Sequence, residues 1–138
     1  MMKQYYAVFD TNVLVSALMS ARQDSPTVRL LDYVIDERIV LLYNDDIISE
    51  YDEVLHRDKF HFSDERIQTV LDLVKTGLCL DPTNSTEDFP DPDDRVFYEV
   101  ALSKDGSYMV TGNRKHFPKR SIVVAPAEML QIIQNEDI

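Results

Sequence analysis

The stretch that decides the fold is Tyr5-Tyr6-Ala7-Val8-Phe9-Asp10-Thr11-Asn12-Val13-Leu14-Val15-Ser16. Its first part is an apolar run that predicts a buried strand over residues 5–9, and this run ends abruptly in a polar turn. A helix is then expected from about Asn12 or Val13, because apolar residues recur at helical spacing after this point. In an open parallel sheet, ligands lie at the carboxyl ends of the strands, which is where this pattern places Asp10.

Strand and helix patterns alternate along the rest of the chain. Because parallel strands need crossover connections, this alternation predicts an α/β fold with a parallel sheet and helices on both of its faces. At 138 residues the chain fits a single domain, residues 1–138. The expected strands are residues 5–9, 39–43, 78–80, 107–111 and 122–125.

Two residues near the third expected strand carry specific expectations. Gly77 follows a stretch with helical spacing and is expected to end that helix as a C-terminal stop. Cys79 has apolar neighbours and is expected to be a small core residue. It is the single cysteine of the chain, which excludes a disulfide framework or a zinc-type cysteine cluster within one chain.

The formal net charge of -11 limits the classes of function. A protein that coats nucleic acid is normally basic, so this class is disfavoured. A carboxylate cluster that holds divalent metal ions remains compatible with the acidity, and so does a simple gain in solubility. No N-terminal signal segment and no membrane-length apolar run are evident in the sequence, so the expected location is the cytoplasm, away from membranes.

Three acids occupy positions that the alternating pattern brings toward one region. Asp10 ends the first strand, Glu50 flanks the buried stripe of the third expected helix, and Asp94 lies in the first turn of a later helix. Asn113 follows the fourth expected strand. If the first and fourth strands are neighbours, Asp10 and Asn113 face each other at the edge of the sheet.

A cluster of this kind suits Mg²⁺ or Mn²⁺. Carboxylates held close together repel one another unless a cation neutralises them, and hard oxygen ligands favour these two ions. Such a site can lower the pKa of a bound water and stabilise charge on a phosphodiester. Each residue alone also has a simpler explanation: Asp10 and Asp94 as helix caps, Glu50 as a solvated helix acid, and Asn113 as a turn residue.

Four segments of the chain together carry a family resemblance. In this set and order, the chain resembles the PIN-domain family of ribonucleases, in particular the branch of toxin components of toxin–antitoxin pairs. The resemblance implies a three-layer α/β/α sandwich with a central parallel sheet of about five strands. The segments are Val8-Phe9-Asp10-Thr11-Asn12-Val13-Leu14-Val15-Ser16-Ala17, Ser49-Glu50-Tyr51 with Val54-Leu55, Asp91-Pro92-Asp93-Asp94 with Phe97 and Ala101, and Val110-Thr111-Gly112-Asn113 with His116-Phe117-Pro118.

The resemblance also implies an activity and the residues that perform it. The implied activity is Mg²⁺- or Mn²⁺-dependent hydrolysis of phosphodiester bonds in single-stranded RNA, by an endoribonuclease. Asn113 departs from the family, because many members have a fourth acid there. Asparagine keeps an oxygen ligand but loses a charge, which weakens metal binding. The implied catalytic metal ligands are Asp10, Glu50, Asp94 and Asn113, with Thr11, Asn12, Asp91 and Asp93 in support.

The segment that follows Asn113 is basic. Arg114, Lys115 and His116 are candidates to bind RNA phosphate near the metal, and a solvated turn is an equally good interpretation.

Two further classes of function remain open. One is a catalytically degenerate PIN-like module that binds RNA or an antitoxin partner, which the missing fourth acid favours. The other is a phosphoryl-transfer or receiver domain that uses Asp10. That class is disfavoured because haloacid-type phosphatases place a second aspartate two residues later, where this chain has Asn12. Resemblance to the family further implies a homo-oligomer in the form of a dimer.

Overall fold

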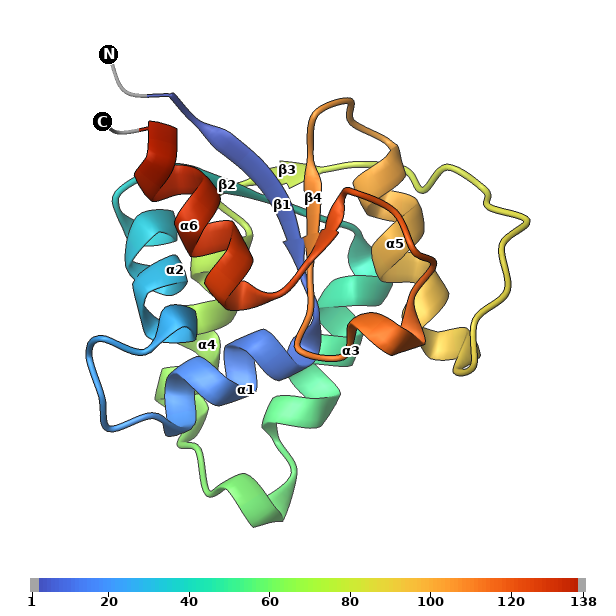
Figure 1. Ribbon diagram of the computed structural model, residues 1–138. Coiled ribbons are helices and arrows are strands. Elements are labelled where there is room, and N and C mark those ends of the chain that lie inside the picture. The colour runs from blue at the N-terminus through green and yellow to red at the C-terminus, as the bar shows by residue number, and fades with distance from the viewer. Residues whose placement is uncertain (1–2, 137–138) are drawn as a thin grey trace.

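A five-stranded parallel sheet with helices on both faces forms the centre of the computed structural model, which describes residues 3–136 (Figure 1). The strand order is β3-β2-β1-β4-β5, and all four pairings are parallel. This arrangement confirms the predicted α/β/α fold class. The strands are β1 (Tyr5–Phe9), β2 (Ile39–Tyr43), β3 (Leu78–Cys79), β4 (Tyr108–Val110) and β5 (Val123–Val124).

Six α-helices and three short 3₁₀ turns link the strands within residues 3–136. Helix α2 packs against both α1 and α6, whereas α5 lies on β1, β2 and β4 and contacts α3. No helix in this part of the chain is both long and apolar enough to cross a membrane. The helices are α1 (Thr11–Met19), α2 (Pro26–Ile35), α3 (Asp45–Leu55), α4 (Asp64–Val74), α5 (Arg95–Leu102) and α6 (Pro126–Glu136), and the turns are η1 (Asp58–Phe60), η2 (Pro92–Asp94) and η3 (Arg114–His116).

Side-chain caps start three of these helices. Ser25, Asn44 and Ser63 each accept a hydrogen bond from the backbone N–H three residues later, and thereby satisfy a donor that has no partner inside the helix. These caps fix where each of the three helices begins.

The register of the sheet places Asp10 beside the end of β4. Phe9 pairs with Val110, and the backbone N–H of Asp10 donates to the Val110 carbonyl oxygen at 2.9 Å. Val8 and Phe9 are fully buried. The first and fourth strands are therefore neighbours, which was the condition for Asp10 to face Asn113, but the residue opposite Asp10 is Thr111.

Gly77 has a different role from the expected helix stop. Helix α4 ends at Val74, and Lys75 occupies its C-cap position. Gly77 instead lies against β2, where a Cβ atom would stand 1.9 Å from the carbonyl oxygen of Leu41. The prediction was wrong because a close approach between two backbones, not the end of the helix, requires a glycine here.

Cys79 is exposed, so its predicted place in the core is wrong. It lies on β3, a two-residue strand at the edge of the sheet, and its neighbour Leu78 is exposed as well. An apolar local sequence could not indicate that this strand lacks a neighbour on one side.

Gly77→Ala is expected to lower the free energy of unfolding by at least about 2 kcal/mol, because the new methyl group overlaps backbone atoms of β2. Gly112→Ala is the matched control, since nothing lies within 4 Å of its Cβ position, and it should cost about 0.5 kcal/mol or less. Urea denaturation measures both values, and equal losses would contradict the packing argument.

Candidate active site

Asp10 is a buried acid at the carboxyl end of β1. Asp10 is only 7% exposed. It occupies the N-cap position of α1, but its side chain forms no cap hydrogen bond. Instead its Oδ2 accepts a hydrogen bond from Thr111 Oγ1 at 2.7 Å. Asp10 therefore occupies the helix-cap position, but its carboxylate is hydrogen-bonded to a side chain of the neighbouring strand end.

Burial raises the pKa of the Asp10 carboxyl. The Thr111 hydrogen bond, the backbone N–H groups of Thr11 and Asn12, and His116 all act in the opposite direction, and burial outweighs them. The protein's own groups therefore offset only part of the free-energy cost of keeping this buried carboxylate ionised.

Thr111 connects Asp10 to the loop after β4, and the sequence analysis did not identify it. Thr111 is fully buried, and its Oγ1 also accepts a hydrogen bond from the backbone N–H of Asn113 at 3.0 Å. The contact between Asn113 and the acid thus passes through the Asn113 backbone and Thr111, rather than through two facing side chains. The signal that could have revealed Thr111 is the register, since residues 10 and 111 follow the paired residues 9 and 110.

Tyr51 is a second residue that the sequence analysis used only as part of a motif. Its hydroxyl donates to the carbonyl oxygen of Phe9 at 2.5 Å, and its ring packs at a tilt against Phe97. Burial, together with the nearby charge of Asp10, raises the pKa of Tyr51, so it remains a neutral donor. Tyr51 therefore ties α3, which carries Glu50, to the end of β1.

Asp94 is electrostatically coupled to Asp10. Burial, together with repulsion from Asp10, Asp91 and Asp93, raises the pKa of Asp94 to about 6. His116 opposes it, with Nδ1 3.8 Å from Asp94 Oδ2. Asp94 was expected in the first turn of a helix, and it instead ends the 3₁₀ turn η2 directly before α5.

Glu50 belongs to the same acidic region but is coupled to a different part of it. Burial raises the pKa of Glu50, followed by the charges of Glu53, Asp93 and Asp91, while Arg57 lowers it. Both Asp91 and Asp93 are exposed. Asp91 Oδ1 accepts a hydrogen bond from the Asp93 backbone N–H at 3.0 Å. The negative charges of Asp91 and Asp93 therefore raise the pKa values of both Glu50 and Asp94.

The donor chemistry of this region fits a divalent cation, although its side chains are not gathered around one point. Within residues 3–136, no three acidic, histidine or cysteine side chains are arranged so that they could hold a metal ion. Buried acids with raised pKa values are nevertheless the groups that a cation would stabilise. Thr11 Oγ1, next to Asp10, is also buried and has no hydrogen-bond partner in the part of the chain that the structure describes.

The three predicted RNA-binding residues lie on η3 but differ in their surroundings. Arg114 Nη1 forms an ion pair with Glu128 Oε1 at 2.6 Å. Lys115 is exposed, and His116 is half-buried beside Asp94. Of the three, His116 is therefore the residue that the structure places at the acids.

Asp94→Asn is expected to raise the free energy of unfolding at about pH 7, in EDTA, by about 1 to 3 kcal/mol. Folding raises the pKa of Asp94 from 3.8 to about 6, so the folded state binds its proton more tightly than the unfolded chain does. The wild type should therefore lose stability from this group as the pH rises through that interval. The neutral amide should remove this loss.

Urea denaturation of both proteins at about pH 4 and about pH 7 measures the difference, because the titration of other groups cancels in the comparison. A stabilisation of the same size at both pH values would contradict the assignment of the raised pKa to Asp94.

Comparison with protein families matches residues 6–115 to a family model described as PIN domain. The matched residues include Asp10, Glu50, Asp94 and Asn113. Comparison with curated proteins and comparison with solved structures give no match. PIN domains are generally metal-dependent nucleases. Because the match spans most of the chain and includes the acidic region, this protein belongs to the PIN-domain family.

Proposed function

We propose that this protein is a metal-dependent endoribonuclease that hydrolyses phosphodiester bonds of single-stranded RNA. The observation that carries the proposal is the electrostatic repulsion between the buried Asp10 and the half-buried Asp94 at the carboxyl edge of a PIN-domain sheet. Two such carboxylates destabilise the fold unless a cation compensates their charges. Their position at the strand ends is the usual ligand-binding position of an open parallel sheet.

Asp10, Asp94 and Glu50 would hold Mg²⁺ or Mn²⁺, and Asn113 would add a neutral oxygen ligand directly or through water. When bound, the cation would supply the positive charge that stabilises a phosphodiester undergoing displacement and would make a water molecule more acidic. The site would lack the fourth carboxylate that many members of the family have, so its affinity for the cation would be reduced.

The chain's own residues orient these ligands. Thr111 donates to Oδ2 of Asp10 and so fixes the plane of the carboxylate. Tyr51 holds the Phe9 carbonyl and thereby the end of the strand from which Asp10 projects. His116, close to Asp94, and the exposed Lys115 would bind the RNA phosphate beside the acids. Arg114 would join them after leaving its ion pair with Glu128.

The same resemblance supports a biological setting. The segments that resemble the toxin branch of the family favour a toxin component that acts on RNA and is held by an antitoxin protein. They also favour a homodimer.

A catalytically degenerate module that binds RNA or an antitoxin partner is the second candidate. Two observations favour it: Asn113 stands in place of a fourth acid, and in residues 3–136 no three potential ligands are arranged to hold a metal ion.

Asp10→Asn is expected to lower Mn²⁺-dependent cleavage of single-stranded RNA by at least about 100-fold, since loss of a ligand exceeds the effect of losing its supporting hydrogen bond. Thr111→Val should lower cleavage by about 10- to 100-fold, and Thr111→Ser should retain it. Asp72→Asn, which changes an exposed acid of α4, is the matched control and should have no effect. Asn113→Asp should bind Mn²⁺ more tightly by calorimetry.

Equal cleavage by Asp10→Asn and the wild type would refute the nuclease proposal. If both the wild type and Asn113→Asp bind RNA but cleave nothing with either Mn²⁺ or Mg²⁺, the degenerate module is the correct assignment.

A further inference from the structure

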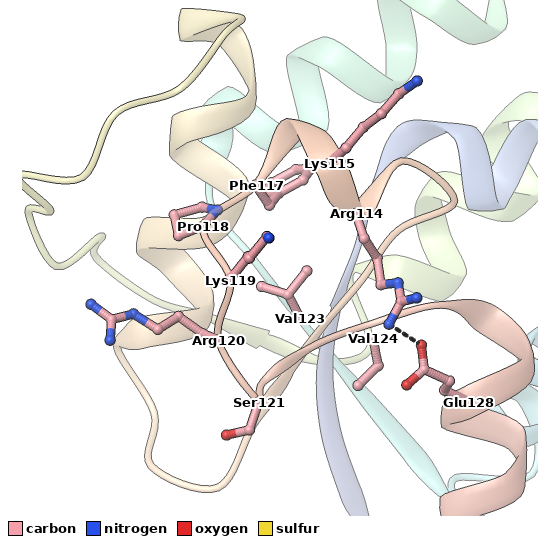
Figure 2. Close-up of a pocket in the computed structure, with 10 residues that line it drawn as sticks. All are labelled: Arg114, Lys115, Phe117, Pro118, Lys119, Arg120, Ser121, Val123, Val124 and Glu128. Carbon is pink, nitrogen blue, oxygen red and sulfur yellow. Dashed lines mark ion pairs between the residues drawn. The ribbon is translucent and has the colours of Figure 1, made fainter.

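A groove of about 590 Å³ lies along the segment that runs from η3 to β5 (Figure 2). Its apolar part is formed by Phe117, Val123 and Val124, all of which are buried. Basic side chains from the same segment surround this apolar surface. The groove therefore combines an apolar surface with positive charge, which suits a ligand with negative groups on a partly apolar framework.

The positive charge is concentrated in seven residues, 114–120. They contain four of the 14 lysines and arginines of the chain and no aspartate or glutamate, although the whole chain has a net charge of -11. These four residues are Arg114, Lys115, Lys119 and Arg120, and all of them line the groove. The net charge of this segment is therefore opposite in sign to that of the whole chain.

The segment that lines the groove also reaches the candidate active site. His116 belongs to the same segment, and its Nδ1 lies 3.8 Å from Asp94 Oδ2. A polymer cut next to Asp94 must extend away from the acids, and this segment offers it cations on the way. A polynucleotide fits better than an acidic peptide, because the segment that lines the groove also carries His116, which lies beside Asp94, one of the acids of the proposed nuclease site.

Two of the four cations are already paired with carboxylates. Arg114 pairs with Glu128 at 2.6 Å, and Figure 2 shows its side chain turned toward that acid. Arg120 donates to Oε1 of Glu87, with Nε at 2.9 Å and Nη2 at 2.8 Å. Within residues 3–136, Lys115 and Lys119 form no ion pair.

Glu87 is held in place by contacts of its own. Tyr98 donates to its Oε2 at 2.6 Å, and the guanidinium of Arg95 donates to the carbonyl oxygen of Glu87 at 2.8 Å. Two residues later, Phe89 packs edge-on against Phe117, which lines the groove. The carboxylate of Glu87 is therefore fixed next to the groove independently of Arg120.

We propose that this groove binds the phosphate backbone of the RNA strand, and that Glu87 competes with RNA for Arg120. A phosphate is an anion that can replace a carboxylate as the partner of a guanidinium. RNA that enters the groove would gain Lys115 and Lys119 directly, and would gain Arg120 only by displacing Glu87. Glu87 thereby lowers the affinity for RNA. The inference rests on the proposed function, since it takes RNA as the substrate.

Fluorescence anisotropy of a labelled oligouridylate in EDTA, where cleavage cannot proceed, tests the groove at several salt concentrations. Lys119→Gln and Lys115→Gln should each weaken binding by about 3- to 10-fold and lower the slope of log affinity against log salt by about 0.7. Glu87→Gln should strengthen binding by about 3- to 10-fold and steepen the slope, because Arg120 becomes available to phosphate. Lys75→Gln, an exposed lysine of the α4 C-cap, is the control for charge alone.

The inference is overturned if Lys75→Gln weakens binding as much as Lys119→Gln, if Glu87→Gln weakens it, or if the wild type does not bind the oligonucleotide. It is also overturned if polyglutamate binds more tightly than oligouridylate, since the groove would then serve an acidic protein. Cleavage assays with Mn²⁺ separate the two proposals. Normal cleavage with unchanged binding in Lys119→Gln and Glu87→Gln refutes the groove alone, whereas groove-dependent binding without cleavage refutes the nuclease alone.

Discussion

The repulsion between the buried carboxylate of Asp10 and the half-buried carboxylate of Asp94 is the constraint on which the rest of the site depends. Asp10 cannot move away from Asp94, because its backbone N–H is hydrogen-bonded to β4 and its carboxylate is hydrogen-bonded to Thr111. Asp94 is held by its position between η2 and α5. The charges are therefore brought together by the sheet and by helix packing, and the free energy that they cost is supplied by the hydrophobic core around them.

Much of the fold could be predicted because it is encoded locally. Buried strands of a parallel sheet are nearly all apolar, so the strands at residues 5–9 and 39–43 were located from the sequence. Gly77 and Cys79 were misread because their environments are set by segments distant in sequence. The contact of Gly77 with Leu41 and the edge position of Cys79 exist only after the sheet has assembled.

The candidate site divides in the same way. The place of Asp10 at the end of β1 could be predicted because an apolar run stops there, whereas Asp94 was expected inside the first turn of a helix and lies directly before it. Thr111 could not be assigned to the site without the strand register, because a shift of one residue would place a different residue beside Asp10. Contacts between distant segments, such as the ion pair of Arg114 with Glu128, have no local signature at all. The sequence thus located the acids but not the groups that orient them or the anions that compete for the nearby cations.

The most direct test of this account is the titration of the Asp94 carboxyl carbon by NMR, with and without excess Mg²⁺. The account predicts a pKa of about 6 in the absence of the ion and a clear fall when Mg²⁺ is added, because a bound cation favours the ionised form. Asp10→Asn should abolish that fall, since the cation would lose the Asp10 carboxylate as a ligand. A pKa of Asp94 that stays near 6 in excess Mg²⁺ would contradict the claim that these acids form a metal site.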